Sequence, residues 1–238
     1  MNNEIAKNIE KLINSKLDAS DNLRAMAKRI REGRGSYKDL YAYSIAMSNA
    51  IKESAKSELV EAFGTGKIKG FENLIGTEIM RSVFEDYHGK LIDLGSAKVN
   101  AQLKSLSLGI KPIKTDVTFS RLLDVVTPLD EATTAEEVAA FLDGEKINQF
   151  YNASLDEFVE ENANFQYEAG LTTVIVRSCG SESCAFCKGL EGTYEYNGTK
   201  EAGPHENIFA RHDGCTCTID VRTTRGGSFT RANNYRRR

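Results

Sequence analysis

Apolar side chains recur at helical spacing along most of the first 160 residues. The pattern over residues 5–13 and 23–30 predicts one or two amphipathic helices, separated by a short polar break. A longer apolar stripe over residues 40–63 predicts another helix, and the run over 71–87 predicts a third helical segment. Stripes of this kind are far more often packing surfaces than cofactor sites, so we expect them to form a core or a helix–helix seam.

Local residue types suggest where these helices begin and end. Ser36 is a predicted N-cap, and Asp39 lies in the first turn, where a negative charge suits the helix dipole. His88 and Gly89 are expected at the end of the third segment, where the imidazole is interpreted as structural rather than catalytic. The pattern weakens between residues 89 and 117, and Gly95 is one of the residues that interrupt it.

The central part of the chain is also predicted to be helical. Residues 119–126 predict a short helix that ends near Pro128. Thr134 and Glu137 have the spacing of a capping box, which opens the next helix. A long apolar run over residues 147–159 follows, and its acidic cluster is interpreted as a solvated helix face. That cluster consists of Asp156, Glu157, Glu160 and Glu161.

The pattern changes after Gly170 from helical spacing to β-branched runs. Residues 171–176, 193–196 and 216–223 predict three strands, and the dipeptide at 197–198 predicts a turn. The predicted fold class is therefore α+β and mostly α. It has long N-terminal helices, a helical central part and a small C-terminal antiparallel sheet that carries a zinc-type Cys/His cluster.

These elements suggest three regions. Residues 1–115 form a helical N-terminal region, and residues 116–222 form a second domain with the Cys/His motif at 184–217. Residues 223–238 form an Arg-rich tail without apolar periodicity, which we expect to be flexible.

Composition excludes some classes of protein. The 238 residues are 40% hydrophobic and 27% charged, which is typical of a soluble globular protein. No run of about 18 apolar residues is present, so we expect no spanning helix and no membrane partner. The amino terminus lacks the apolar core of a secretory signal, which predicts synthesis in a reducing cytoplasm.

All five cysteines and two of the three histidines lie between residues 177 and 221. In a reducing compartment an odd number of cysteines favours metal binding over disulfides. Two pairs of soft ligands separated by a loop suit tetrahedral Zn²⁺, which we predict as a structural cofactor. The predicted ligands are Cys184, Cys187, His212, Cys215 and Cys217, with the fourth position open between His212 and Cys217.

Other interpretations of the same residues stay open. His205 is a weaker candidate ligand, and Cys179 lies outside the pattern as a small buried group or free thiol. Reduced core cysteines, or disulfides formed outside the cell, are the structural alternative. A catalytic alternative would use Cys179 or Cys184 as nucleophile, His205 or His212 as base and Asp213 to orient it. Paired thiols add nothing to such a mechanism, so we predict that the protein is not an enzyme and has no small-molecule substrate.

The spacing around the cluster resembles a known family. The residues concerned are Cys184, Cys187, Leu190, Gly192, Pro204, His205, His212, Cys215 and Cys217, preceded by a run from residue 169 to 177. This pattern resembles the end of MuF-like minor head proteins of tailed phages and prophages, in the form found with Gram-positive hosts. The common form of the last motif has Pro-Asn where this chain has Asp213 and Gly214. The resemblance covers about residues 110–222.

The resemblance implies a structural minor head protein, also called a minor capsid protein, that acts in head morphogenesis. It would contribute to head assembly, DNA packaging or DNA delivery near the portal. Its expected partners are the portal protein, the major capsid protein or both, and its expected location is the host cytoplasm during assembly and then the virion head.

A second possible function follows from the tail. After Asp220 the chain has no acidic residue and carries Arg222, Arg225, Arg231, Arg236, Arg237 and Arg238. These guanidinium groups are candidates for contact with packaged DNA phosphates or with an acidic partner surface, both of which depend on salt. The alternative function is a zinc-stabilised nucleic-acid-binding protein that uses this tail.

Overall fold

The computed structural model describes residues 2–64, 74–180, 183–198, 208–212 and 214–225. Its first helices are α1 (Asn2–Ala19), α2 (Asp21–Arg31), α3 (Tyr37–Phe63), the π-helix η1 (Ile75–Met80) and α4 (Arg81–Ser105). The helices that follow are α5 (Phe119–Glu131), α6 (Ala135–Asp143) and α7 (Lys146–Glu168). The last elements are β1 (Thr172–Ser178), α8 (Ala185–Gly189), β2 (Gly192–Glu195) and β3 (Thr218–Thr224).

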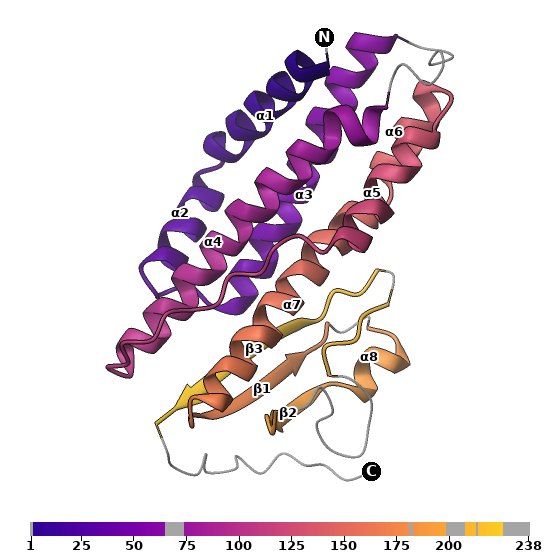
Figure 1. Ribbon diagram of the computed structural model, residues 1–238. Helices are drawn as coiled ribbons and strands as arrows, with labels where there is room; N and C mark the ends of the chain where they lie inside the picture. The colour runs from indigo at the N-terminus through magenta and orange to yellow at the C-terminus, as the bar shows by residue number, and fades with distance from the viewer. Residues whose placement is uncertain (1, 65–73, 181–182, 199–207, 213, 226–238) are drawn as a thin grey trace.

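The long helices α3, α4 and α7 form an elongated bundle, and the small sheet lies at one end of it (Figure 1). Helix α1 packs against α3, and α2 packs against α3 and α4. The sheet contacts α3 and α7, so these two helices connect the bundle to the sheet. The predicted fold class is confirmed: the chain is mostly helical, with a small C-terminal antiparallel sheet and Cys/His groups close to it.

Both predicted helix starts are present. The Asp39 backbone N–H donates to Ser36 Oγ at 3.1 Å, and the Ser36 N–H donates back to the Asp39 carboxylate at 2.7 Å. Thr134 and Glu137 form the same reciprocal arrangement at the start of α6. Each capping box satisfies backbone donors that have no partner within the first helical turn.

The predicted end of the third helical segment near His88 is wrong, because α4 continues through Gly89 and Gly95 to Ser105. A Cβ atom on Gly95 would lie 2.8 Å from Cε1 of Phe158, so the glycine allows α4 to approach α7 closely. His88 is buried in the interior of α4, its ring centroid lies 6.4 Å from that of Phe150, and burial lowers its pKa.

The prediction that the next helix stops near Pro128 is also wrong, because α5 extends to Glu131. The last turn of α5 is held against η1: the Thr77 backbone N–H donates to Asp130 Oδ1 at 3.0 Å, and the Thr77 hydroxyl donates to Oδ2 at 2.5 Å. A Cβ atom on Gly76 would lie 1.9 Å from the Val126 carbonyl oxygen, so η1 lies directly on the α5 backbone. These tertiary contacts outweigh the local effect of the proline.

One hydrophobic core contains residues from α1 through β3 and therefore continues across the predicted boundary near residue 115. The segment between α4 and α5 runs back along the bundle (Figure 1). Asn162 of α7 holds it, because its side chain accepts from the Ile113 N–H at 2.9 Å and donates to the Ile113 carbonyl at 2.8 Å. Packing alone does not separate the two regions, and their division stays a prediction.

The sheet has the order β2-β1-β3, and both neighbouring pairs are antiparallel. The three predicted strands are thus confirmed, each within two residues of its expected start. The residues of β1 at 173, 175 and 177 are buried, and they lie opposite buried residues 223, 221 and 219 of β3. The sheet therefore turns one face of β1 and β3 toward the molecular interior.

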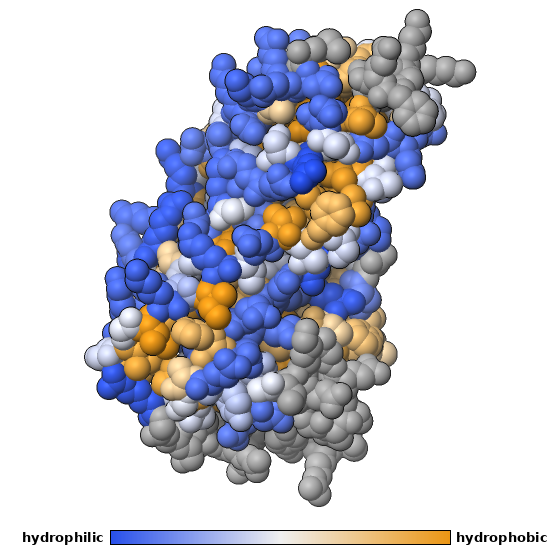
Figure 2. Space-filling model, viewed as in Figure 1, coloured by the Kyte–Doolittle hydropathy of each residue, from blue (hydrophilic) through white to orange (hydrophobic). Residues whose placement is uncertain are grey.

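The surface is mainly polar on the face viewed in Figure 2, with smaller hydrophobic groups among the hydrophilic ones. The exposed large hydrophobic residues include Phe119 and Leu123, which lie one turn apart on α5. None of the helices in the described ranges is both long and apolar enough to cross a membrane.

Gly95 and Gly89 provide a matched test of the α4–α7 contact. We expect Gly95→Ala to lower the free energy of unfolding by about 1–3 kcal/mol, because the added methyl group overpacks the buried ring of Phe158. Gly89→Ala meets no atom within 4 Å and should raise it by about 0.5–1 kcal/mol, since alanine favours a helix interior. Urea unfolding of both variants measures the difference; equal effects would contradict the proposed close approach.

Candidate metal centre

The Cys/His cluster is built from two short segments that flank β2 in the sequence. Cys184 is the N-cap residue of α8, and Cys187 lies in the first turn of this short helix. His212 and Cys215 lie in the segment before β3, and Cys217 immediately precedes the first residue of β3. All five predicted ligands therefore come together at the end of the sheet.

These residues form two overlapping groups that could hold a metal ion. Cys184, Cys187 and His212 form one group, and Cys187, Cys215 and Cys217 form the other, with the ligand atoms of each group within 4.8 Å of one another. Cys187 belongs to both groups and is 1% exposed. The predicted cysteines and histidine thus form groups that could hold a metal ion, which confirms this part of the prediction.

The distances resemble the edges of a tetrahedral zinc site. His212 Nε2 lies 3.1 Å from Cys184 Sγ and 3.0 Å from Cys187 Sγ, and Cys187 Sγ lies 3.5 Å from Cys215 Sγ. Zinc–sulfur bonds of about 2.3 Å and zinc–nitrogen bonds of about 2.0–2.1 Å place such pairs about 3.6–3.8 Å apart. The observed separations are shorter than those values by about 0.3–0.6 Å.

His212 contacts both cysteines of the first pair, so its Nε2 is placed where it could serve as a ligand together with them. A turn makes this possible: the Cys215 N–H donates to the His212 carbonyl at 3.1 Å, and Gly214 has a φ of +73°. That φ value lies in the left-handed region that glycine adopts without steric cost. Gly214 therefore has a conformational role in presenting His212 and Cys215 together.

The thiols have unequal pKa values. Burial raises the pKa of Cys187, and its hydrogen bonds with Cys217 and Cys215 raise it further. A backbone hydrogen bond from Cys187 is the largest of the contributions that lower the pKa of Cys184. Burial alone would raise the pKa of Cys217. Its hydrogen bonds, of which the one with Cys179 has the largest effect, outweigh burial and lower this pKa. Neighbouring positive charge favours the thiolate forms of clustered cysteines, and a metal ion bound here would supply such charge.

Arg177 lies behind the cluster and was not predicted to take part in it. It is 1% exposed on the inward face of β1. One guanidinium nitrogen donates to the carbonyls of Ile208 and Ala210 at 2.6 and 2.7 Å, and another lies 3.8 Å from Cys215 Sγ. Arg177 therefore fixes the backbone that leads to His212 and places a positive charge beside a thiol.

Arg211 connects the cluster to the helical bundle. Its guanidinium binds the Asp156 carboxylate of α7 through two nitrogens and reaches Cys215 Sγ at 3.6 Å. Tyr41 of α3 donates a hydrogen bond to the same carboxylate, and its ring centroid lies 5.1 Å from the Arg211 guanidinium carbon. Burial opposes the charge on Arg211, but Asp156 outweighs it and raises the pKa of Arg211, so the guanidinium stays charged.

The interpretation of Asp156 as part of a solvated helix face is therefore wrong. Asp156 is 5% exposed and forms a buried ion pair, whereas Glu161 of the same helix is exposed. Glu157 is half-buried and pairs with Arg121 of α5.

Three or more thiolates around a divalent ion would leave a net negative charge, and Arg177 and Arg211 are placed to offset it.

Several other predicted residues are not part of this arrangement or cannot be placed in it. His205 and Asp213 lie outside the described residues, as do the tail arginines at 231 and 236–238. Arg222 has a side chain that is 61% exposed and lies 3.3 Å from Asp220. Arg225 donates to the Ser107 carbonyl at 2.6 Å.

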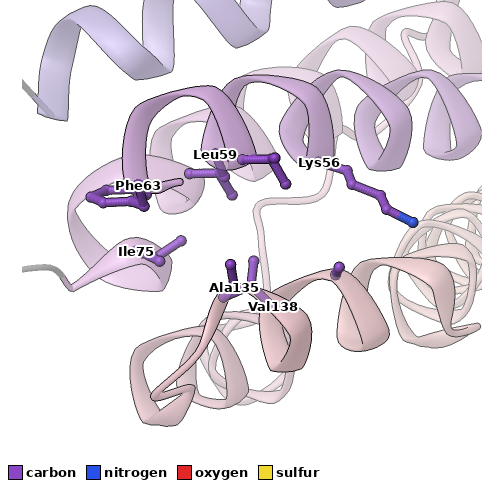
Figure 3. A pocket seen from close by; sticks show the side chains of 8 residues that line it. Lys56, Leu59, Phe63, Ile75, Ala135 and Val138 are labelled. Carbon is purple, nitrogen blue, oxygen red and sulfur yellow. The ribbon is translucent and has the colours of Figure 1, made fainter. Parts of the chain in front are cut away.

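A separate small cavity lies between the end of α3, η1 and α6 (Figure 3). Its lining is apolar apart from Lys56, whose ammonium group pairs with Asp143 at 2.6 Å. Its volume of about 10 Å³ is roughly what one water molecule needs. It is therefore too small to hold an organic substrate.

Comparisons with known protein families, with curated proteins and with solved structures gave no match.

Asp156 and Glu161 allow a matched test of the buried ion pair. We expect Asp156→Asn to lower the free energy of unfolding by about 3–5 kcal/mol, because it leaves the buried Arg211 without its counter-ion. Glu161→Gln, on the exposed side of the same helix, should change it by less than about 0.5 kcal/mol. Urea unfolding measures both values, and an unchanged stability of Asp156→Asn would contradict the role of this pair.

Proposed function

We propose that the Cys/His cluster is a structural zinc site. Cys184, Cys187 and His212 supply three ligands, and Cys215 or Cys217 supplies the fourth. The proposal is supported by the mutual contacts of these side chains and by thiolate and imidazole chemistry, which suits zinc among common divalent ions. Zinc would join the α8 segment to the start of β3, where the sheet alone provides few apolar contacts.

A structural role is favoured over a catalytic one by the composition of the site. Four protein ligands close the coordination sphere and leave no position for water or substrate. The nearest charged groups, Arg177 and Arg211, are occupied with backbone carbonyls and with Asp156. They are therefore placed to stabilise thiolates and to hold the backbone.

For the whole protein we propose the role of a non-enzymatic minor head protein of a tailed phage or prophage. What supports this is the resemblance to MuF-like proteins, whose characteristic cysteines and histidine are the residues that gather at the metal site. The elongated helical bundle offers long surfaces to neighbouring subunits (Figure 1). The portal protein and the major capsid protein are the proposed partners during assembly in the host cytoplasm and in the virion head.

The nucleic-acid-binding alternative depends on the arginine tail. Arg222 is exposed, which is compatible with a phosphate contact, but Arg225 is directed to the Ser107 carbonyl. The other four arginines lie outside the described residues, so this alternative stays a prediction.

Elemental analysis tests the metal site. We expect about one zinc per chain in untagged protein, and chelation should lower the melting temperature with loss of β-structure, because structural zinc contributes to folding free energy. Cys187→Ser should abolish zinc binding, since Cys187 belongs to both ligand groups. Cys179→Ser, which changes a cysteine outside both groups, is the matched control and should retain the metal. Metal-free wild-type protein with an unchanged melt would disprove the zinc site.

Co-purification tests the proposed role in the particle. We expect the full chain to bind the portal or major capsid protein encoded in the same genome, and a variant lacking residues 226–238, which leaves β3 intact, to retain that binding. Gel shift with duplex DNA at several salt concentrations gives the comparison. Loss of DNA binding on truncation, with normal head assembly, would favour the nucleic-acid alternative. Failure of the full chain to bind either structural protein would contradict the minor head role.

A further inference from the structure

Cys179 and Cys217 form a second arrangement of thiols beside the proposed metal site. Their Sγ atoms lie 2.6 Å apart, and both residues are free cysteines in this structure. Cys179 is partly buried and Cys217 is 1% exposed. Cys179 belongs to neither ligand group, and its thiol also donates to the Cys187 carbonyl at 3.2 Å.

The register of the sheet explains why these two residues meet. Strands β1 and β3 pair antiparallel, and the last pair places Ser178 opposite Thr218. Cys179 directly follows the last residue of β1 and Cys217 directly precedes the first residue of β3, so continuing the same register by one residue sets them opposite each other. They also lie on the inward face, because residues two apart in a strand share a face with Arg177 and Ile219.

This position suits a cross-strand disulfide. Directly opposite residues in an antiparallel pair have Cα atoms about 4.5–5.5 Å apart, and disulfides span Cα separations of about 4.4–6.8 Å. The bond can therefore form without a large movement of either strand. Two observations therefore place Cys179 and Cys217 close enough for a disulfide: the pairing of the strands and the contact between the two sulfur atoms.

The contact between Cys179 and Cys217 also affects which cysteine, Cys215 or Cys217, supplies the fourth metal ligand. If Cys217 bonds to Cys179, Cys215 remains for the metal at 3.5 Å from Cys187, with both arginines near its sulfur. We propose that Cys179 and Cys217 form a reversible cross-strand disulfide beside a Cys184–Cys187–His212–Cys215 metal centre. The ligand assignment rests on the proposed zinc site, whereas the disulfide rests on the strand register.

The chemistry is thiol–disulfide exchange with a low-molecular-weight disulfide such as glutathione disulfide. One of the two cysteines loses its proton and attacks the oxidant, which forms a mixed disulfide and releases one glutathione thiolate. The other cysteine then loses its proton and attacks the protein sulfur of the mixed disulfide, forming the Cys179–Cys217 bond and releasing the second glutathione thiolate. The two cysteines give up two electrons and two protons, and the oxidant becomes two molecules of glutathione.

The disulfide would hold the end of β1 to the start of β3 independently of the metal. In a reducing cytoplasm the two thiols stay free, and in oxidising surroundings they close. A protein that leaves the cell would thereby gain a covalent connection at the place where its sheet depends on thiolate ligands.

The test uses the full chain, equilibrated in glutathione buffers of increasing oxidising strength and then alkylated. We expect a mass decrease of about 2 Da before alkylation, a non-reduced peptide that joins Cys179 to Cys217, and an unchanged zinc content. Cys179→Ser should abolish the cross-link and retain zinc. Oxidation should raise the melting temperature of the wild type and leave that of Cys179→Ser unchanged.

Three results would overturn the proposal. They are a wild type that stays fully reduced in the most oxidising buffer, a cross-link that maps to Cys184, Cys187 or Cys215, and loss of zinc together with closure of the Cys179–Cys217 bond. The zinc content of the reduced wild type tests the metal site separately. A metal-free protein that still forms the cross-link would disprove the zinc site and retain the disulfide.

Discussion

The buried ion pair between Asp156 and Arg211 connects the segment before β3 to the helical bundle. Arg211 lies beside His212 in the sequence, and Asp156 lies on α7, where Tyr41 of α3 also binds it. A charge removed from water is costly unless a partner offsets it, so the segment before β3 is fixed where Asp156 can reach it. The same guanidinium approaches Cys215, which means that the position of the candidate metal ligands depends on the helical bundle.

The helices, the strands and the grouping of cysteines were predictable because they depend on local signals. Helical periodicity, the capping boxes at Ser36 and Thr134 and the β-branched runs after Gly170 each act over a few residues. The helix ends were less predictable. Gly95 looked like a break but allows α4 to contact Phe158, and the turn beyond Pro128 is held by Thr77. Contacts between distant segments decide such positions, and local propensity does not include them.

The residues around the metal ligands were missed for the same reason. Asp156 is one of four acids on a helix, and nothing in its neighbours indicates that it faces inward. Arg177 offered one indication, since it shares the strand face of Ile175 and is therefore a charge at an interior position. The meeting of Cys179 with Cys217 likewise required the strand register. With these groups in place, the site is a set of cysteines and one histidine beside two guanidinium groups, an arrangement that could hold a metal ion.

X-ray absorption at the zinc edge tests this account most directly, because it reports the atoms bound to the metal in the intact protein. We expect a four-coordinate zinc with three sulfur neighbours at about 2.3 Å and one nitrogen neighbour at about 2.0–2.1 Å. That result would place one histidine and three of the clustered cysteines on one ion. A protein without zinc, or a zinc surrounded mainly by oxygen, would contradict the structural metal centre on which the proposed function depends.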